Sequence, residues 1–245
     1  MSKIENLSRA PIQEAIFDFR VGFGHPLTKP DFHILSEGLV ATYSKQDELN
    51  RHSAQMKFEG ATHSVSQSTV FGGMKYESNG GEFVVQAQID GLTISRLHPY
   101  AGWDNLYEEA RRVWELFERS LKPLSLERIA CRYINRFELP VGNFDFRDYL
   151  VSAPEIPPGL PQGVSRYFLQ QEVPSPENGA IVLLTQALES GLPGSVAFIL
   201  DIDTFKSSSF DVGDESWWLE LENLRSLKNQ FFFGSITDKC KDLFR

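Results

Sequence analysis

The chain has little cysteine and no long apolar run. Only two of its 245 residues are cysteines, Cys131 and Cys240, and neither has a partner at metal-binding spacing. Two isolated cysteines provide no disulfide framework, which fits a reducing compartment. The first residues carry no apolar segment typical of a signal peptide, and no stretch of about 18 uncharged apolar residues occurs. The sequence therefore predicts a cytoplasmic protein that does not enter a membrane.

The common catalytic and cofactor motifs are also missing. The chain contains no G-x-S-x-G element, no Walker A loop and no dinucleotide-binding glycine fingerprint. Its five histidines form no H-x-H or H-x-x-x-H pair and no Cys/His pair. We therefore expect no metal and no cofactor, and the sequence favours a non-enzymatic role without excluding catalysis.

Basic residues are outnumbered by acidic ones. The chain has 24 lysines and arginines against 33 aspartates and glutamates, a formal net charge of −9. Nonspecific binding to nucleic acid requires a basic surface, so we expect none. An acidic protein of ordinary globular composition, with 41% hydrophobic residues, instead suits a basic protein partner through charge complementarity.

Hydrophobic periodicity predicts two successive sets of elements. In each set a strand comes first, then a helix, then three more strands and a long helix. The first set comprises a strand at 14–23, a helix at 30–43, strands at 53–59, 64–77 and 82–97, and a helix at 104–121. The second comprises a strand at 127–139, a short helix at 144–151, strands near 165–173, 179–188 and 194–203, and a long helix from about Asp214.

The two sets match each other at an offset of about 113 or 114 residues. Trp103 then falls on Trp217, and the strand pattern from Phe83 falls on that from Val196. We interpret this as an internal duplication within a single pseudo-twofold α+β domain. The repeats span about residues 10–123 and 124–245. The expected fold is an antiparallel sheet of about eight strands from two β-α-β-β-β-α repeats, with two long helices packed on one face.

One face of such a sheet stays uncovered and carries polar side chains. Strand alternation places arginines, carboxylates and amides on this open face. Its candidate binding residues are Asp18, Arg20, Gln88, Asp90, Arg132, Arg136, Asp201 and Asp203. Three interpretations are open: cross-strand charge pairs on a solvated face, a docking surface anchored by Arg132 and Arg136, or a divalent metal site that also uses Glu14.

A second candidate site is the corner between the strand at 82–97 and the following helix. It runs from Ser95 to Trp103 and includes the candidates Arg96 and His98. His98 is a possible general base. The alternative is a plain turn, in which Pro99 ends the strand and the rings of Tyr100 and Trp103 pack at the corner.

Four groups of residues follow a recognisable pattern. They are Ala10-Pro11-Ile12 with Glu14-Ala15; Ser95-Arg96-Leu97 with Pro99-Tyr100 and Trp103; Arg132-Tyr133-Ile134-Asn135-Arg136 with Leu139-Pro140; and Leu224-Arg225 with Lys228-Asn229 and Phe231. With these groups the chain resembles a sporadically distributed, uncharacterised bacterial protein family over nearly its whole length. The resemblance implies no activity. The family's patchy distribution implies mobile genes such as defence or toxin–antitoxin cassettes.

Three functions are compatible with these features. The first is a non-enzymatic protein-binding component of a prokaryotic antiviral defence or toxin–antitoxin module, which engages its partner through the open face or a sheet edge. The second is an enzyme acting on nucleotides or nucleic acid, with arginines on phosphate and carboxylates on a metal. The third is a sensor that binds a small anionic ligand between the two halves. A homodimer is compatible with all three.

Overall fold

An antiparallel sheet forms the base of the fold. The computed structural model describes residues 7–59, 62–140 and 145–245, and within them nine strands have the order β2-β3-β4-β5-β1-β6-β9-β8-β7. The strands are β1 (Ile12–Gly22), β2 (Lys45–Glu59), β3 (Thr62–Glu77), β4 (Phe83–Gln88), β5 (Gly91–Leu97), β6 (Ser125–Pro140), β7 (Tyr167–Ser175), β8 (Ala180–Ser190) and β9 (Ser195–Phe210). The helices are α1 (His33–Leu39), α2 (Trp103–Leu121), α3 (Trp217–Ser235) and α4 (Asp238–Asp242).

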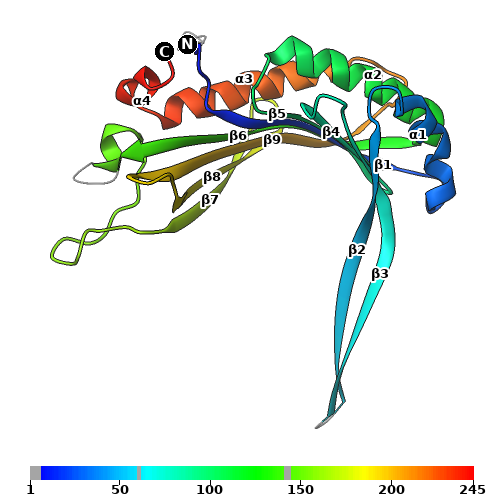
Figure 1. Cartoon of the computed structure of the whole chain (residues 1–245), viewed down its shortest axis with the longest axis horizontal. Coiled ribbons are helices and arrows are strands. Elements are labelled where there is room, and N and C mark those ends of the chain that lie inside the picture. The colour runs from blue at the N-terminus through cyan, green and yellow to red at the C-terminus, as the bar shows by residue number, and fades with distance from the viewer. Residues whose placement is uncertain (1–6, 60–61, 141–144) are drawn as a thin grey trace.

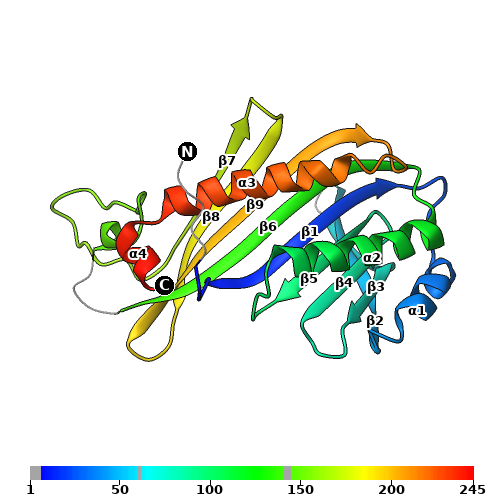
Figure 2. The ribbon, with the colours of Figure 1, turned by 90° about the horizontal axis from the view of Figure 1, so that it is seen from above.

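The long helices α2 and α3 lie over the same face of the sheet (Figures 1 and 2). Apolar residues recur at helical spacing on the buried side of α2, which is why this helix packs on the sheet. Phe19 of β1 shows the packing: its ring centroid lies 5.2 Å from that of Trp114 on α2 and 5.4 Å from that of Trp217 on α3. Every described strand except β2, and both long helices, contribute residues to this continuous buried region or pack against it.

Two strands from different halves of the chain meet at the centre of the sheet. β1 pairs with β6 so that Phe17 lies opposite Cys131. β5 flanks β1 and leads into α2, whereas β9 flanks β6 and leads into α3. The two long helices therefore occupy matching places on the two sides of this central pair.

The α+β class with an antiparallel sheet is confirmed, but the predicted strand count is wrong. Residues 82–97 form two strands, β4 and β5, instead of one, so the described chain has nine strands and not about eight. The turn between them is formed by Ile89 and Asp90, because Gln88 pairs with Gly91 across the hairpin. β5, not β4, is the counterpart of β9 in the sheet, so the alignment of Phe83 with Val196 is incorrect.

The helices and the repeat also differ from expectation. The helix expected at 144–151 is reduced in the described residues to a 3-10 turn at Phe146–Asp148, and that expected at 30–43 is a 3-10 turn followed by the short α1. α4 was not predicted. The first half contributes five strands and the second half four, so the two halves are not equal copies of one β-α-β-β-β-α unit.

β2 and β3 form a long hairpin that projects away from the helix-covered body (Figure 1). They have 15 and 16 residues, and β3 joins the rest of the sheet only through the pairing of 73–77 with β4. Among the described helices, none combines the length and apolar character needed to cross a bilayer.

Candidate functional site

The open face carries the predicted charges, but they pair with one another. Arg128 bridges Asp18 and Asp203 at N–O distances of 2.8 and 3.1 Å. Arg132 forms a bidentate pair with Asp201 at 2.9 and 2.6 Å. Burial raises the pKa of Asp203, and the charges of Arg128 and Arg132 oppose that rise. The centre of this face is therefore a network of cross-strand ion pairs.

The remaining open-face candidates lie at its margins. Asp90 lies in the turn after β4 rather than in a strand, and Arg51 and Arg20 approach it at 2.5 and 3.6 Å. Gln88 accepts a 3.4 Å hydrogen bond from Arg51, and Arg136 pairs at 2.8 Å with a carboxylate on its own strand. No cluster of three or more histidine, cysteine, aspartate or glutamate side chains suited to a metal ion occurs in the described ranges.

Arg96 is not accessible to a partner, contrary to the prediction. Its place on β5, opposite Ala15 and Phe83, turns it toward the helix-covered face, where it is only 8% exposed. Its guanidinium carbon lies 5.0 Å from the centroid of the Phe83 ring. Within the described structure, Nε and Nη1 of Arg96 have no hydrogen-bond partner. Arg96 is therefore a buried cation of the core.

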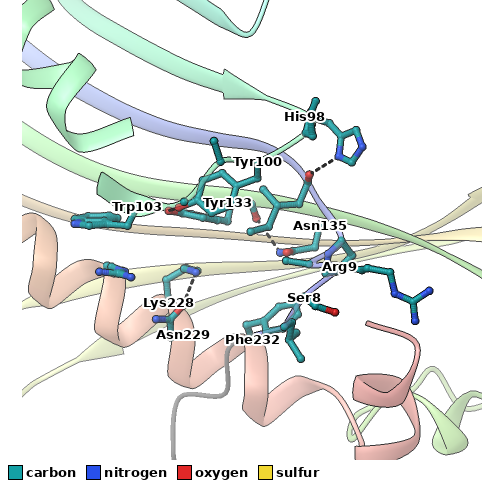
Figure 3. Close-up of a pocket in the computed structure, with 18 of the residues that line it drawn as sticks. Ser8, Arg9, His98, Tyr100, Trp103, Tyr133, Asn135, Lys228, Asn229 and Phe232 are labelled. Atoms are coloured by element: carbon teal, nitrogen blue, oxygen red, sulfur yellow. Dashed lines mark hydrogen bonds between the residues drawn. The ribbon is translucent and has the colours of Figure 1, made fainter. Parts of the chain in front are cut away.

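A pocket of about 500 Å³ lies at the corner after β5, between the two halves of the chain (Figure 3). Tyr133 and Asn135 of β6 line it from the sheet, and α3 and the corner form opposite walls. The segment 7–11 lines its remaining side. All four groups of the family pattern contribute residues to this pocket, which the individual motifs did not reveal.

Three polar residues of α3 face the pocket because their spacing, 225, 228 and 229, brings them to one side of the helix. Lys228 is 7% exposed; its ammonium lies 3.8 Å from the centroid of the Tyr133 ring and donates a 2.5 Å hydrogen bond to Asn229. The Arg225 guanidinium stacks over Trp103 at 4.6 Å. Burial lowers the pKa of Lys228 to about 8, and the charge of Arg225 acts in the same direction.

The pocket rim is held by contacts to the backbone. Nδ1 of His98 lies 3.3 Å from the carbonyl oxygen of Ile12, which can only accept, so this nitrogen donates. His98 itself is exposed and lies at the outer edge of the site (Figure 3). Arg9 turns away from Lys228 and donates to the main-chain oxygen of Arg245 at 2.7 Å. The contact to Ile12 fixes the His98 ring at the corner and leaves Nε2 as its basic nitrogen, so the turn and the general-base role both stay predictions.

The opposite end of the helix layer offers an internal comparison. Trp114 of α2 occupies the position 114 residues before Lys228. Its ring lies edge-on to Trp217, with centroids 5.0 Å apart, and the hollow there measures only about 190 Å³. An indole thus fills space at one end, whereas an amine borders open space at the other.

The arginines at matching positions of the two long helices, Arg111 and Arg225, also have different surroundings. Arg111 lies 114 residues before Arg225 and makes a 2.7 Å ion pair with Glu215. The residue 114 positions before Glu215 is Ala101, so the pocket has no carboxylate at the corresponding place. Among the described residues that line the pocket, none is an aspartate or glutamate.

Comparison with known proteins does not assign the chain to a family. No protein-family model matches the chain, and no curated protein matches it significantly. The resemblance to the sporadically distributed bacterial family therefore rests on the residue pattern alone.

Proposed function

We propose that the protein binds a small organic anion in the pocket between α3 and the corner after β5. The observation that carries this proposal is the pair of cations Arg225 and Lys228 in a site whose described lining contains no acid. Burying a charge without a counter-charge is costly, so such a pair is expected where a ligand supplies the negative charge. The anionic-ligand sensor is thus the best supported of the three functions compatible with the sequence.

The rest of the lining supports an organic ligand. Tyr100, Trp103, Tyr133 and Phe232 surround the cations with aromatic surface, and ligand sites commonly combine apolar walls with a few polar groups. α2, 19 residues long, begins beside the pocket at Trp103, and the preceding Gly102 provides no side-chain cap. Its first N–H groups add positive potential on this side, which the carboxylate of Asp104 in the first turn partly offsets. A carboxylate or phosphate attached to a small carbon skeleton would satisfy both kinds of surface.

The test is calorimetric titration of the purified protein with pyruvate, adenosine monophosphate and inorganic phosphate. Arg225→Gln should weaken the tightest of these interactions about tenfold or more, since one charge-assisted hydrogen bond contributes about 1.5–3 kcal/mol. Arg111→Gln is the matched control, because Arg111 is already paired with Glu215 outside the pocket. Absence of binding by all three anions, or equal loss in both variants, would contradict the proposal.

A protein partner at the open face, as part of a defence or toxin–antitoxin module, is the second candidate function. The side chains of Arg132 and Arg136 remain 43% and 36% exposed although both are paired, and half-exposed arginines are favoured interface anchors. Capture of one basic protein from the native host, lost in a folded Arg136→Ala variant, would support this function. Unchanged capture by that variant would count against it.

A further inference from the structure

The amine of Lys228 has surroundings that differ from those of an ordinary structural lysine. It borders the pocket and the residue is only 7% exposed. Its hydrogen-bond acceptor is the neutral amide of Asn229. Lys206, in contrast, pairs with the carboxylate of Glu220 at 3.1 Å. A buried amine without a carboxylate is poorly stabilised as an ammonium ion.

Burial and a neighbouring cation are the two conditions that make a lysine amine nucleophilic at neutral pH. Both occur here, because Arg225 precedes Lys228 by one helical turn and its charge opposes protonation of the amine. With a pKa of about 8, a substantial fraction of Lys228 carries a free electron pair at physiological pH.

We infer that Lys228 captures a small carbonyl-bearing anion, a 2-oxo acid, as a Schiff base, with Arg225 binding the carboxylate of that acid. The inference rests on the proposed function, since it uses the same pocket and the same cation. A 2-oxo acid fits because its carboxylate is attached directly to its carbonyl carbon. Arg225 and Lys228, adjacent on one side of α3, match these two groups.

The chemistry balances without any further reactant. The electron pair of the neutral Lys228 amine attacks the carbonyl carbon, and the carbonyl oxygen takes up a proton to give a carbinolamine. Loss of the hydroxyl group as water, with loss of the remaining amine proton, leaves the carbon–nitrogen double bond. One amine and one carbonyl compound thus give one imine and one water, with no change in oxidation state.

A hydrogen-bonded pair of tyrosines lines the pocket beside the amine. The hydroxyl groups of Tyr100 and Tyr133 lie 2.7 Å apart, and the Lys228 ammonium covers the Tyr133 ring. Burial raises the pKa of Tyr100 to about 12, so its hydroxyl stays protonated at neutral pH and can donate a hydrogen bond to the carbonyl oxygen of a ligand. Figure 3 shows the two tyrosines side by side, facing α3.

The test is reductive trapping of the full chain with sodium cyanoborohydride and pyruvate, followed by intact-mass measurement and peptide mapping. We expect one adduct, located on Lys228, that disappears in Lys228→Arg and persists in Lys206→Met. Arg225→Gln should reduce labelling by pyruvate about tenfold while sparing labelling by acetaldehyde, which has no carboxylate. Mapping of the wild-type adduct gives the answer even if Lys228→Arg fails to fold.

The possible failures separate the two proposals. Pyruvate that binds in calorimetry but leaves Lys228 unlabelled would overturn the Schiff base and leave the anion site standing. Labelling spread over several lysines, with no preference for Lys228, would also overturn the Schiff base. Absence of both binding and labelling, together with no binding of the other anions, would overturn both proposals.

Discussion

Replacing Lys228 with methionine should stabilise the protein in the absence of ligand. A drop in pKa from 10.5 to about 8 corresponds to a cost of about 3 kcal/mol for holding the charged lysine in the fold at neutral pH. Methionine fills a similar volume without that cost. It also loses the contact of the ammonium with the Tyr133 ring and the hydrogen bond to Asn229, each worth about 1 kcal/mol.

The net effect for Lys228→Met is therefore a gain of about 1–2 kcal/mol in the free energy of unfolding at pH 7. For a chain of this length that gain raises the melting temperature by roughly 2–8 °C. A gain in stability on removal of a charged side chain is typical of sites kept for function rather than for folding.

The gain should also depend on pH in a defined direction. The unfolded chain holds the lysine proton up to pH 10.5, whereas the folded chain releases it near pH 8. Between these values the unfolded state binds more protons, so the wild-type protein becomes more stable as pH rises. The advantage of Lys228→Met should therefore shrink above pH 8 and fade toward pH 10.5.

Urea unfolding of both proteins at pH 7 and pH 9.5 measures this difference. Lys206→Met serves as the control, because it breaks an ion pair with Glu220 and should be slightly less stable than wild type at both pH values. Lys228→Met could instead be less stable than wild type at pH 7, or the difference in free energy of unfolding could stay the same at both pH values. Either result would mean that contacts in the fold fully offset the cost of burying the ammonium, which would contradict the prediction.

Two further predictions concern the open face and the thiols. Arg132→Ala should lower the free energy of unfolding by about 1–3 kcal/mol, because it removes the bidentate partner of Asp201, whose side chain is 13% exposed. Arg136→Ala should lower it by about 0.5 kcal/mol or less in the same urea titration. Equal losses in the two variants would mean that the ion pair of Arg132 with Asp201 stabilises the fold no more than the pair of Arg136 does. Cys131 and Cys240 should resist Ellman's reagent at pH 8 until denaturant is added, because both are buried and burial raises the pKa of each thiol to about 12; rapid labelling of the native protein would contradict this.

Local patterns in the sequence predicted much of the fold. The alternation of β1 and β6 gave the correct faces, so Arg132 and Arg136 lie on the open side with Asp203, as period-2 geometry requires. The helical spacing of α2 was equally clear. The missed strand break at Ile89-Asp90 was readable in principle, because Asp90 followed by Gly91 is a turn signal within an otherwise alternating pattern.

The candidate site was not readable in the same way. Arg225 and Lys228 are ordinary polar residues in the sequence, but in the fold Lys228 is buried against Tyr133 of β6 and Arg225 stacks on Trp103 of the corner. The contact with Trp103 joins segments more than a hundred residues apart, which no local period can express. The pairing of Arg128 with two carboxylates likewise depends on strand register, so the open face was overrated as a binding surface.

The central β1–β6 pair has a consequence for how the chain folds. Phe17 and Cys131, which face each other there, are 114 positions apart, and such long-range pairing is entropically expensive and slow to form. The pocket takes Ile12 from one side of this junction and Tyr133 from the other, so it does not exist until the two halves have joined. A ligand that binds this pocket would recognise only completed molecules, and by mass action it would hold them in the folded state.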